Sequence, residues 1–415
     1  MIANCLVRRP GYEVHLVDKK PNPLDLPMSK SYPIQLQARG LEALREIPGL
    51  EELVANQGIR PVGVCFHQQG GSEQKISIDP PKLFCDHSQM TMTMLENLMR
   101  ADAAKGSSLS VDFDCVLNNL DIDNKKVSVS TKSKKKSMSF DTLVAADGGR
   151  SKVRHDLEQK NLIQVEQKDI PDEYRTISIS KTCSDGSVNL DSDYIHGWGL
   201  DQGRIRIVAA PMDNDYLNGA FVSEKNHDPI ANLKSPQDVL DFFEVLSPKS
   251  LAKLVSMEEA TRILNQSAIS LVTVKCDRLH VKDCVLLIGD AAHAMTQSVG
   301  HGCISALQDV QVFCRLLDEY NDDWQQALPA YTSARLADAH ALSIMSDYAV
   351  PTSQLMKVEW GVRQLVRKVL HSAFADLMRP LPVELLSDTT LSYSEVLEKS
   401  GWWIDRVKIS KSQRT

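Results

Sequence analysis

The chain has 415 residues, of which 42% are hydrophobic and 24% are charged, and its formal net charge is −7. This composition is typical of a globular protein with two or more domains, and the acidic balance argues against a general nucleic-acid binder. Nine scattered cysteines without a C-x-x-C pair argue against a structural zinc site and a disulfide framework and favour a reducing compartment. The same cysteines lead us to expect an intracellular protein, cytoplasmic or organellar and not secreted. No segment approaches the ~18–20 apolar residues that cross a bilayer, so we expect no transmembrane segment.

The N-terminal residues predict part of a nucleotide-binding unit. Residues 1–9 are typical of the second half of a helix, and residues 13–17 predict a strand that ends at Asp18. An acidic residue at the tip of the second strand of such a unit binds the cofactor ribose, and the alternative is a turn residue that closes the strand. The first strand and its G-x-G-x-x-G turn are not in the sequence, so we expect roughly 25 residues to be missing upstream, which leaves a targeting peptide unassessed.

Further elements follow in chain order. Residues 39–54 and 95–104 have helical patterns, and residues 111–144 predict a set of strands. The lysines between these strands, at 132 and 134–136, favour a solvated hairpin turn over a phosphate-binding or nuclear-import patch.

The second half of the chain begins with a different pattern. Residues 174–222 alternate as in an antiparallel sheet that runs to about residue 273, and residues 285–288 predict a buried parallel strand. Residues 303–317 predict an amphipathic helix. A basic amphipathic helix is expected over 362–378, where docking on the protein's own core is favoured over a membrane surface.

Two motifs end their strands abruptly, Asp147-Gly148 and Gly289-Asp290. In an open α/β sheet, nucleotide cofactors lie at such carboxyl ends of strands, so the pair predicts a split cofactor site in a redox enzyme. Asp290 can accept hydrogen bonds from a ribityl hydroxyl, and Gly300 and Gly302 expose amides at the start of the following helix. The alternative is that Asp290 is an N-cap and the glycines are turn residues. His293 has no ligand partner at helical spacing, and we predict no metal site.

Longer segments resemble a known family. The similarity lies in the two motifs, in residues 31–44, 195–198, 242–243 and 274–294, and in the late segment 391–395. Together these segments resemble the class A FAD-dependent aromatic monooxygenases, in particular the kynurenine 3-monooxygenases. The resemblance covers essentially the whole chain. It implies an α/β fold with a Rossmann-like FAD-binding domain (residues 1–165 and 274–345, incomplete at the N-terminus), an inserted, mostly antiparallel β-sheet substrate domain (166–273) and a C-terminal helical region (346–415).

The resemblance also implies a reaction. NADPH would reduce FAD, O2 would form a flavin C4a-hydroperoxide, and one oxygen atom would pass to an aromatic small molecule without a protein nucleophile, so no catalytic residue is named. The implied FAD-binding residues are Asp18 at the adenosine ribose, Arg39 near the flavin, Asp147 and Gly148 in a motif shared with NADPH, Gly289 and Asp290 at the ribityl chain, and Gly300, Gly302, Cys303 and Ile304 at the flavin edge.

Several positions depart from the family pattern. Met92, Gln297 and Ile304 replace an arginine, a proline and an asparagine near the cofactor. Val64 and Ala349 replace the arginine and asparagine of the substrate site, which argues against kynurenine as the substrate. Two alternatives therefore stand beside the monooxygenase: a truncated or degenerate flavoprotein homologue without catalytic activity, and a halogenase or epoxidase on the same scaffold. The oligomeric state stays open.

Overall fold

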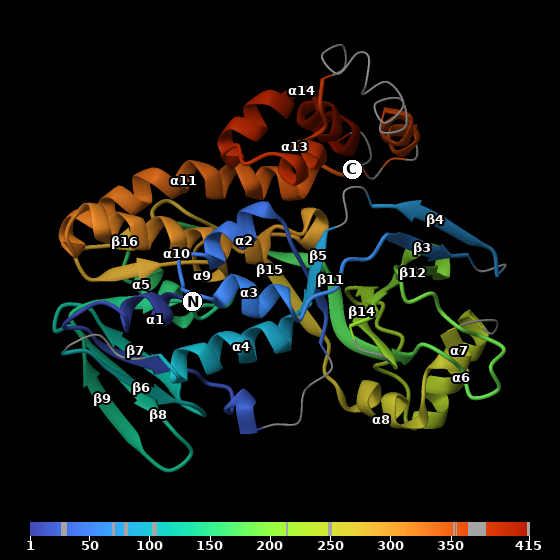
Figure 1. Ribbon diagram of the computed structural model, residues 1–415, viewed down its shortest axis with the longest axis horizontal. Helices are drawn as coiled ribbons and strands as arrows, with labels where there is room; N and C mark the ends of the chain where they lie inside the picture. The colour runs from blue at the N-terminus through green and yellow to red at the C-terminus, as the bar shows by residue number, and fades with distance from the viewer. Residues whose placement is uncertain are drawn as a thin grey trace. The chain divides into compact units, whose positions relative to one another are not determined.

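The computed structural model describes residues 1–25, 31–68, 71–78, 82–101, 106–212, 215–247, 251–351, 353, 355–363 and 379–412. It has the predicted mixed α/β architecture (Figure 1). The chain divides into two compact units, each assembled from separate segments: Met1–Gln37, Leu44–Val116 and Asp169–Leu271 form the first unit, and Ala38–Ala43, Leu117–Lys168 and Val272–Thr415 form the second. The predicted domain boundaries differ from this division and stay a prediction.

The first unit begins with a small α/β layer. Strand β1 (Glu13–Val17), which has the predicted bounds, pairs in parallel with β6 (Ser108–Asp112). Helices α1 (Ile2–Leu6) and α4 (His87–Met99) share an apolar cluster beside these strands. The helix predicted from residue 95 starts eight residues earlier, because the Asp86 side chain accepts a hydrogen bond from the Gln89 amide and caps α4.

A seven-stranded sheet in the order β15-β11-β14-β13-β12-β3-β4 has most of its residues in the same unit. Its strands are β3 (Gly63–His67), β4 (Glu73–Ser77), β11 (Val165–Ser180), β12 (Tyr194–Leu200), β13 (Ile205–Ala210), β14 (Tyr216–Glu224) and β15 (Ile269–Cys276). The pairs from β11 to β12 are antiparallel, as predicted, whereas β3 joins β12 in parallel. Strand β4 is an edge strand, antiparallel to β3.

Three helices cover one face of this sheet. They are α6 (Pro236–Leu246), α7 (Leu251–Leu254) and α8 (Met257–Asn265). A capping box between Ser235 and Asp238 starts α6, and the buried side chains of Phe243, Trp198 and Phe221 belong to the apolar core between helices and sheet.

Shorter elements complete the first half of the chain. They are β2 (Pro33–Leu36), which pairs with β5 (Leu83–Asp86), η1 (Pro23–Asp25), η2 (Asp201–Gly203), α2 (Ala38–Leu44) and α3 (Leu50–Ala55). The prediction of one helix over 39–54 is wrong, because Pro48-Gly49 separates α2 from α3 and Gly49 adopts a left-handed φ of 75°.

The second unit places short strands against long helices. Strand β17 (Val285–Leu287) pairs in parallel with β10 (Leu143–Ala145) and antiparallel with β16 (His280–Val281), which confirms the buried parallel strand. A second sheet consists of β7 (Val116–Asp121), β8 (Lys126–Ser130) and β9 (Lys135–Ser139).

The helical elements of this unit are α5 (Lys152–Gln159), α9 (Asp290–His293), η3 (Gln297–Val299), α10 (Gly302–Glu319), α11 (Trp324–Tyr348), α13 (Pro382–Asp388) and α14 (Tyr393–Ser412). Helix α10 confirms the helix predicted over 303–317. Helices α11, α13 and α14 share an apolar cluster that includes Leu342, Leu386 and Tyr393. Most of the basic helix predicted over 362–378 lies outside the described residues.

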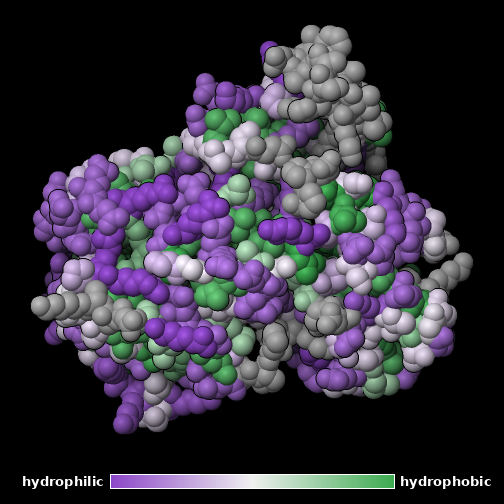
Figure 2. Space-filling view, viewed as in Figure 1, coloured by the Kyte–Doolittle hydropathy of each residue, from purple (hydrophilic) through white to green (hydrophobic). Residues whose placement is uncertain are grey.

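Hydrophilic side chains cover much of the face drawn in Figure 2, with hydrophobic residues in smaller patches between them. In the described part of the chain, no helix has both the length and the apolar composition needed to span a membrane.

Candidate functional site

Two turns at the ends of adjacent parallel strands form the centre of the candidate site. Strands β10 and β17 pair in register in the second unit. Asp147-Gly148 follows β10, and Gly289-Asp290 follows β17. The two motifs singled out in the sequence therefore lie at the same edge of one sheet, where a nucleotide cofactor is expected.

The first turn starts a helix. One carboxylate oxygen of Asp147 accepts hydrogen bonds from the amides of Lys152 (2.7 Å) and Val153 (3.2 Å), in the first turn of α5. Gly148 has a φ of 81°, a left-handed conformation that favours glycine. Asp147 is exposed, so its second oxygen remains accessible to a ligand while the first fixes the helix.

The second turn presents a carboxylate. Gly289 has φ 56° and ψ −143° and is the N-cap of α9, whereas Asp290 is the first residue of that helix, so the alternative of Asp290 as an N-cap is wrong. Among the described residues, none donates a hydrogen bond to the Asp290 side chain. This side chain is exposed, yet the protein around it removes enough water to raise its pKa. Asp290 is thus a recessed, accessible hydrogen-bonding group.

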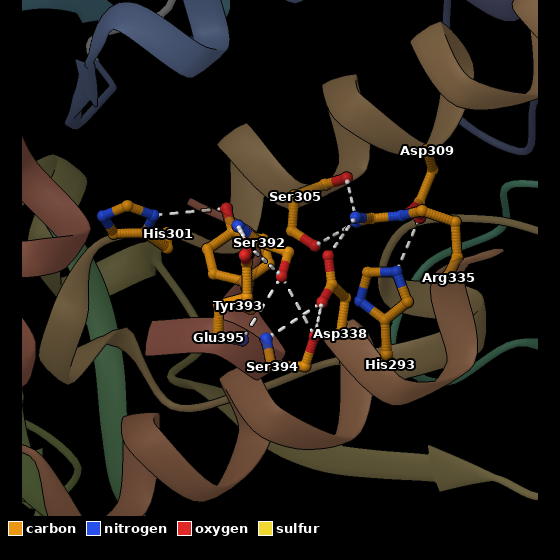
Figure 3. A network of polar contacts seen from close by, with 10 residues as sticks. All are labelled: His293, His301, Ser305, Asp309, Arg335, Asp338, Ser392, Tyr393, Ser394 and Glu395. Atoms are coloured by element: carbon orange, nitrogen blue, oxygen red, sulfur yellow. Dashed lines mark hydrogen bonds and ion pairs between the residues drawn. The ribbon is translucent and has the colours of Figure 1, made fainter. Parts of the chain in front are cut away.

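A buried aspartate beneath this turn holds it in place. Asp309 in α10 accepts a hydrogen bond from the Gly289 amide (2.8 Å). It also accepts hydrogen bonds from His293 Nε2 (2.6 Å) and Arg335 Nε (2.9 Å), which are drawn in Figure 3. Burial by itself would raise the pKa of Asp309, but its interactions with His293 and Arg335 outweigh burial and hold the pKa at about 2. The carboxylate is therefore ionised and fully paired.

The network continues into the C-terminal helices (Figure 3). Arg335 in α11 donates to Ser305 Oγ (3.1 Å) and to Asp338 (3.3 Å). Asp338 in turn accepts hydrogen bonds from the amide (2.9 Å) and hydroxyl (2.7 Å) of Ser394 in α14. A continuous polar chain thus joins α9, α10, α11 and α14.

The glycines at the start of α10, Gly300 and Gly302, leave open space around their backbones. Gly300 ends η3 with a φ of 67°, and no atom lies within 4 Å of a Cβ built there. Gly302 is the first residue of α10, followed by Cys303, which is half-buried, and Ile304, whose side chain is fully buried. Because Ile304 as a whole residue has no exposed surface, its predicted contact with the flavin stays a prediction.

Arg39 lies in the same unit beside an aromatic residue. Its Nε donates to the carbonyl of Thr389 (3.1 Å), and its guanidinium stacks over the Tyr393 ring at 5.0 Å. The Tyr393 hydroxyl lies 3.3 Å from Nδ1 of the buried His301, the residue between Gly300 and Gly302. Arg39 is buried, and its Nη2 has no hydrogen-bond partner in the described part of the chain.

Asp18, the remaining predicted residue, lies at the end of β1 in the first unit. It is exposed, and its carboxylate accepts a hydrogen bond from the Lys20 amide at 2.8 Å. This contact is the turn contact considered as the alternative, and it leaves the other carboxylate oxygen available.

Sequence reasoning missed Asp309 and Arg335, which hold the Gly289 turn, and His301 and Tyr393, which lie beside Arg39 and the glycines at the start of α10. One signal was present, because Asp309 is a carboxylate between the apolar Leu307 and Val310 of a predicted amphipathic helix. A charge in such a position needs a buried partner, but the identity of Arg335 as that partner depends on the packing of α11.

A family model described as FAD binding domain matches residues 1–344. Kynurenine 3-monooxygenase from Legionella pneumophila (strain Corby) is 27% identical over 352 residues, which are 83% of this chain and 76% of that protein. Kynurenine 3-monooxygenase from Sus scrofa is 24% identical over 408 residues, 96% of this chain and 83% of that protein.

Two solved structures share the fold. The tetrameric form of 2-methyl-3-hydroxypyridine-5-carboxylic acid oxygenase has a TM-score of 0.63 at 17% identity and covers 92% of this chain and 91% of its own. Tetracycline destructase Tet(51) has a TM-score of 0.60 at 14% identity and covers 93% of this chain and 94% of its own.

Proposed function

The chain belongs to the FAD binding domain family and is an FAD-dependent monooxygenase, and from this premise we propose that it hydroxylates an aromatic small molecule with NADPH as the electron donor and O2 as the oxygen source. The observation that carries the proposal is the position of Asp147 and Asp290 at the ends of adjacent parallel strands. This is where α/β proteins bind nucleotide cofactors.

The residues present fit FAD. An exposed carboxylate without a partner among the described residues, at Asp290, suits a ribityl hydroxyl that donates a hydrogen bond. The unpartnered Nη2 of Arg39 suits an acceptor atom of the cofactor. Gly300 and Gly302 leave room for a ring to approach the first amides of α10, whose helix dipole favours negative charge.

Each predicted residue would have a distinct role. Asp290 would hold the ribityl chain and Asp18 the adenosine ribose, while Asp147 and Gly148 would serve FAD and NADPH together. When bound, FAD would supply the redox chemistry that activates O2 toward the aromatic ring, with NADPH as the source of electrons. The chain's own task is to bind, orient and exclude water.

An apolar sheet face in the first unit supports an aromatic substrate. Phe66 and Val208 are 42% and 45% exposed, and both lie in register with Gly197 between them. A Cβ at Gly197 would lie 3.1 Å from the Phe66 ring, so this glycine leaves room for the ring. Val64, on the same face of β3, offers no charge for an amino-acid carboxylate, so we propose a substrate other than kynurenine.

The cysteines suit a reducing compartment inside the cell. All nine are free thiols, and eight of them, including Cys65 in β3 and Cys85 in β5, are buried. Free thiols persist where the surroundings keep them reduced, so we propose such a compartment for this protein.

Spectroscopy of the purified chain tests the cofactor proposal. We expect the purified chain to be yellow, or to take up added FAD and then show a flavin spectrum. Asp290→Ala should lose this spectrum while its circular dichroism shows that it is still folded. Asp283→Ala is the matched control, because this exposed aspartate lies in the turn between β16 and β17 and forms a surface ion pair with Lys125. A colourless chain that takes up no FAD would favour the degenerate homologue.

Isotope labelling tests the reaction. NADPH oxidation in the presence of a panel of aromatic compounds should increase with the substrate, and ¹⁸O2 should place one labelled atom in its product. Flavin reduction that no aromatic compound stimulates would favour a halogenase or epoxidase over a hydroxylase.

A further inference from the structure

Three ligand-type side chains meet on one face of the seven-stranded sheet in the first unit. Cys65 in β3 pairs with His196 in β12, and His67, two residues further along β3, points to the same face. All three side chains are buried, and one potential metal-ligating atom from each lies within 4.8 Å of the others. They derive from segments about 130 residues apart, so no local spacing announces them in the sequence.

The hydrogen bonds of the two histidines leave two ring nitrogens facing each other. His196 Nε2 lies 2.9 Å from the carbonyl oxygen of Asp191, and this acceptor requires an N–H. His67 Nδ1 lies 3.4 Å from a carboxylate oxygen of Glu73. His67 Nε2 and His196 Nδ1 lie 2.7 Å apart, so His67 Nε2 donates its N–H to the lone pair of His196 Nδ1 when no metal is bound.

A metal ion can take the place of the proton between these two nitrogens, because each ring can then direct one lone pair at the ion and keep its outward nitrogen protonated. The outward nitrogens already contact a backbone carbonyl and a carboxylate, which are the partners that orient metal-bound histidines.

We propose that Cys65 Sγ, His67 Nε2 and His196 Nδ1 bind a divalent cation of the Zn²⁺ class. Zn²⁺ is bound in proteins by cysteine thiolates and histidine nitrogens, and three protein ligands leave its fourth position open. Zinc bonds of roughly 2.0–2.3 Å require ligand atoms about 3.3–3.6 Å apart. The two nitrogens must therefore separate by less than about 1 Å, and every other pair of ligand atoms, all now within 4.8 Å, must reach the same range.

The surroundings hold the site and give access to it. The Trp198 ring stacks on His67 with a centroid distance of 4.5 Å and an interplanar angle of 10°, and so limits rotation of the imidazole. On the other side, β4 is an exposed edge strand, and the Glu73 side chain is 51% exposed. The Glu73 carboxylate therefore lies between His67 and the solvent, where it can attract a cation toward the site.

Cobalt titration tests the site. The purified 415-residue chain, treated with a chelator and desalted, is titrated with Co²⁺ and followed by absorption at wavelengths beyond those of flavin. We expect one equivalent of bound cobalt with the d–d bands of a tetrahedral ion, displaced by Zn²⁺. Cys65→Ser and His196→Gln should each weaken cobalt binding at least tenfold, in the range found when metal-site residues are changed.

Two matched variants serve as controls. Cys85→Ser changes another buried free cysteine of the same unit, and His15→Gln changes an exposed histidine there; both should bind cobalt as the unchanged chain does. Folding of each variant is checked by circular dichroism. A folded, unchanged chain without tetrahedral cobalt bands overturns the proposal without any variant, and so does undiminished binding in folded Cys65→Ser. Because the readout is cobalt binding, its outcome is independent of flavin content and of hydroxylation.

Discussion

The backbone amide of Gly289 donates a 2.8 Å hydrogen bond to the buried carboxylate of Asp309, so helix α10 supports the turn that presents Asp290. The same carboxylate binds His293 and Arg335. Asp309, for which no ligand contact is predicted, therefore determines the geometry of the turn at Gly289. Substitution of Asp309 or of its neighbours should alter both the stability of the protein and its flavin binding.

Asp309→Asn should destabilise the protein strongly. The substitution preserves shape but leaves the buried guanidinium of Arg335 with Asp338 as its remaining anionic partner, and loss of one partner from a buried ion pair costs up to about 3–5 kcal/mol. Urea unfolding measures the free energy of unfolding, and flavin content should fall with it. Asp318→Asn, at an exposed position of the same helix, should change stability by less than about 0.5 kcal/mol. Equal stability of the two variants would contradict the role of Asp309.

The contribution of Asp309 to the free energy of unfolding should be lost in acid. Its pKa is about 2 in the folded protein, below the value of 3.8 for an unperturbed aspartate. A lowered folded-state pKa stabilises the protein above the unfolded value, and this stabilisation is lost as the pH falls through the folded value. The difference in unfolding free energy between unchanged chain and Asp309→Asn should thus be constant above about pH 5 and shrink between about pH 4 and pH 2. A difference that does not change down to about pH 2 would be inconsistent with this assignment.

Gly289→Ala should strain the cofactor turn. Gly289 has a φ of 56°, and an added Cβ would lie 3.2 Å from the Cβ of Ala306. We expect a loss of about 1–3 kcal/mol in unfolding free energy together with weaker flavin binding. Gly401→Ala is the control, because this glycine lies within α14 with open space around it, and alanine there should be neutral or stabilise by up to about 1 kcal/mol. The test is chemical denaturation of both variants at the same pH.

Tyr393 should act through its ring more than through its hydroxyl. Tyr393→Phe removes the 3.3 Å contact with His301 but keeps the ring beneath Arg39, so we expect a loss of about 1 kcal/mol. Tyr393→Ala removes the fully buried ring as well and should cost about 3–5 kcal/mol. Thermal unfolding of the two variants separates the contributions. Similar losses in both would show that the hydroxyl contact dominates.

Local patterns were sufficient for many elements. Strand β1 has the predicted bounds, and α10 and β17 lie where periodicity places them, because alternation and 3.6-residue repeats are properties of consecutive residues. The failures also have local causes. Pro48-Gly49 divides one predicted helix into α2 and α3, and the Asp86 cap starts α4 earlier than its apolar pattern indicates.

The sequence by itself determined the two glycine–aspartate turns and their order, because an apolar strand that stops at Asp-Gly or Gly-Asp is a local event. Only the tertiary structure decided what supports these turns. Asp309 and Arg335 are 26 residues apart on different helices, and Cys65 and His196 are 131 positions apart on neighbouring strands. Such partners meet through helix packing and strand register, which depend on the burial of whole faces and not on the spacing of a few residues.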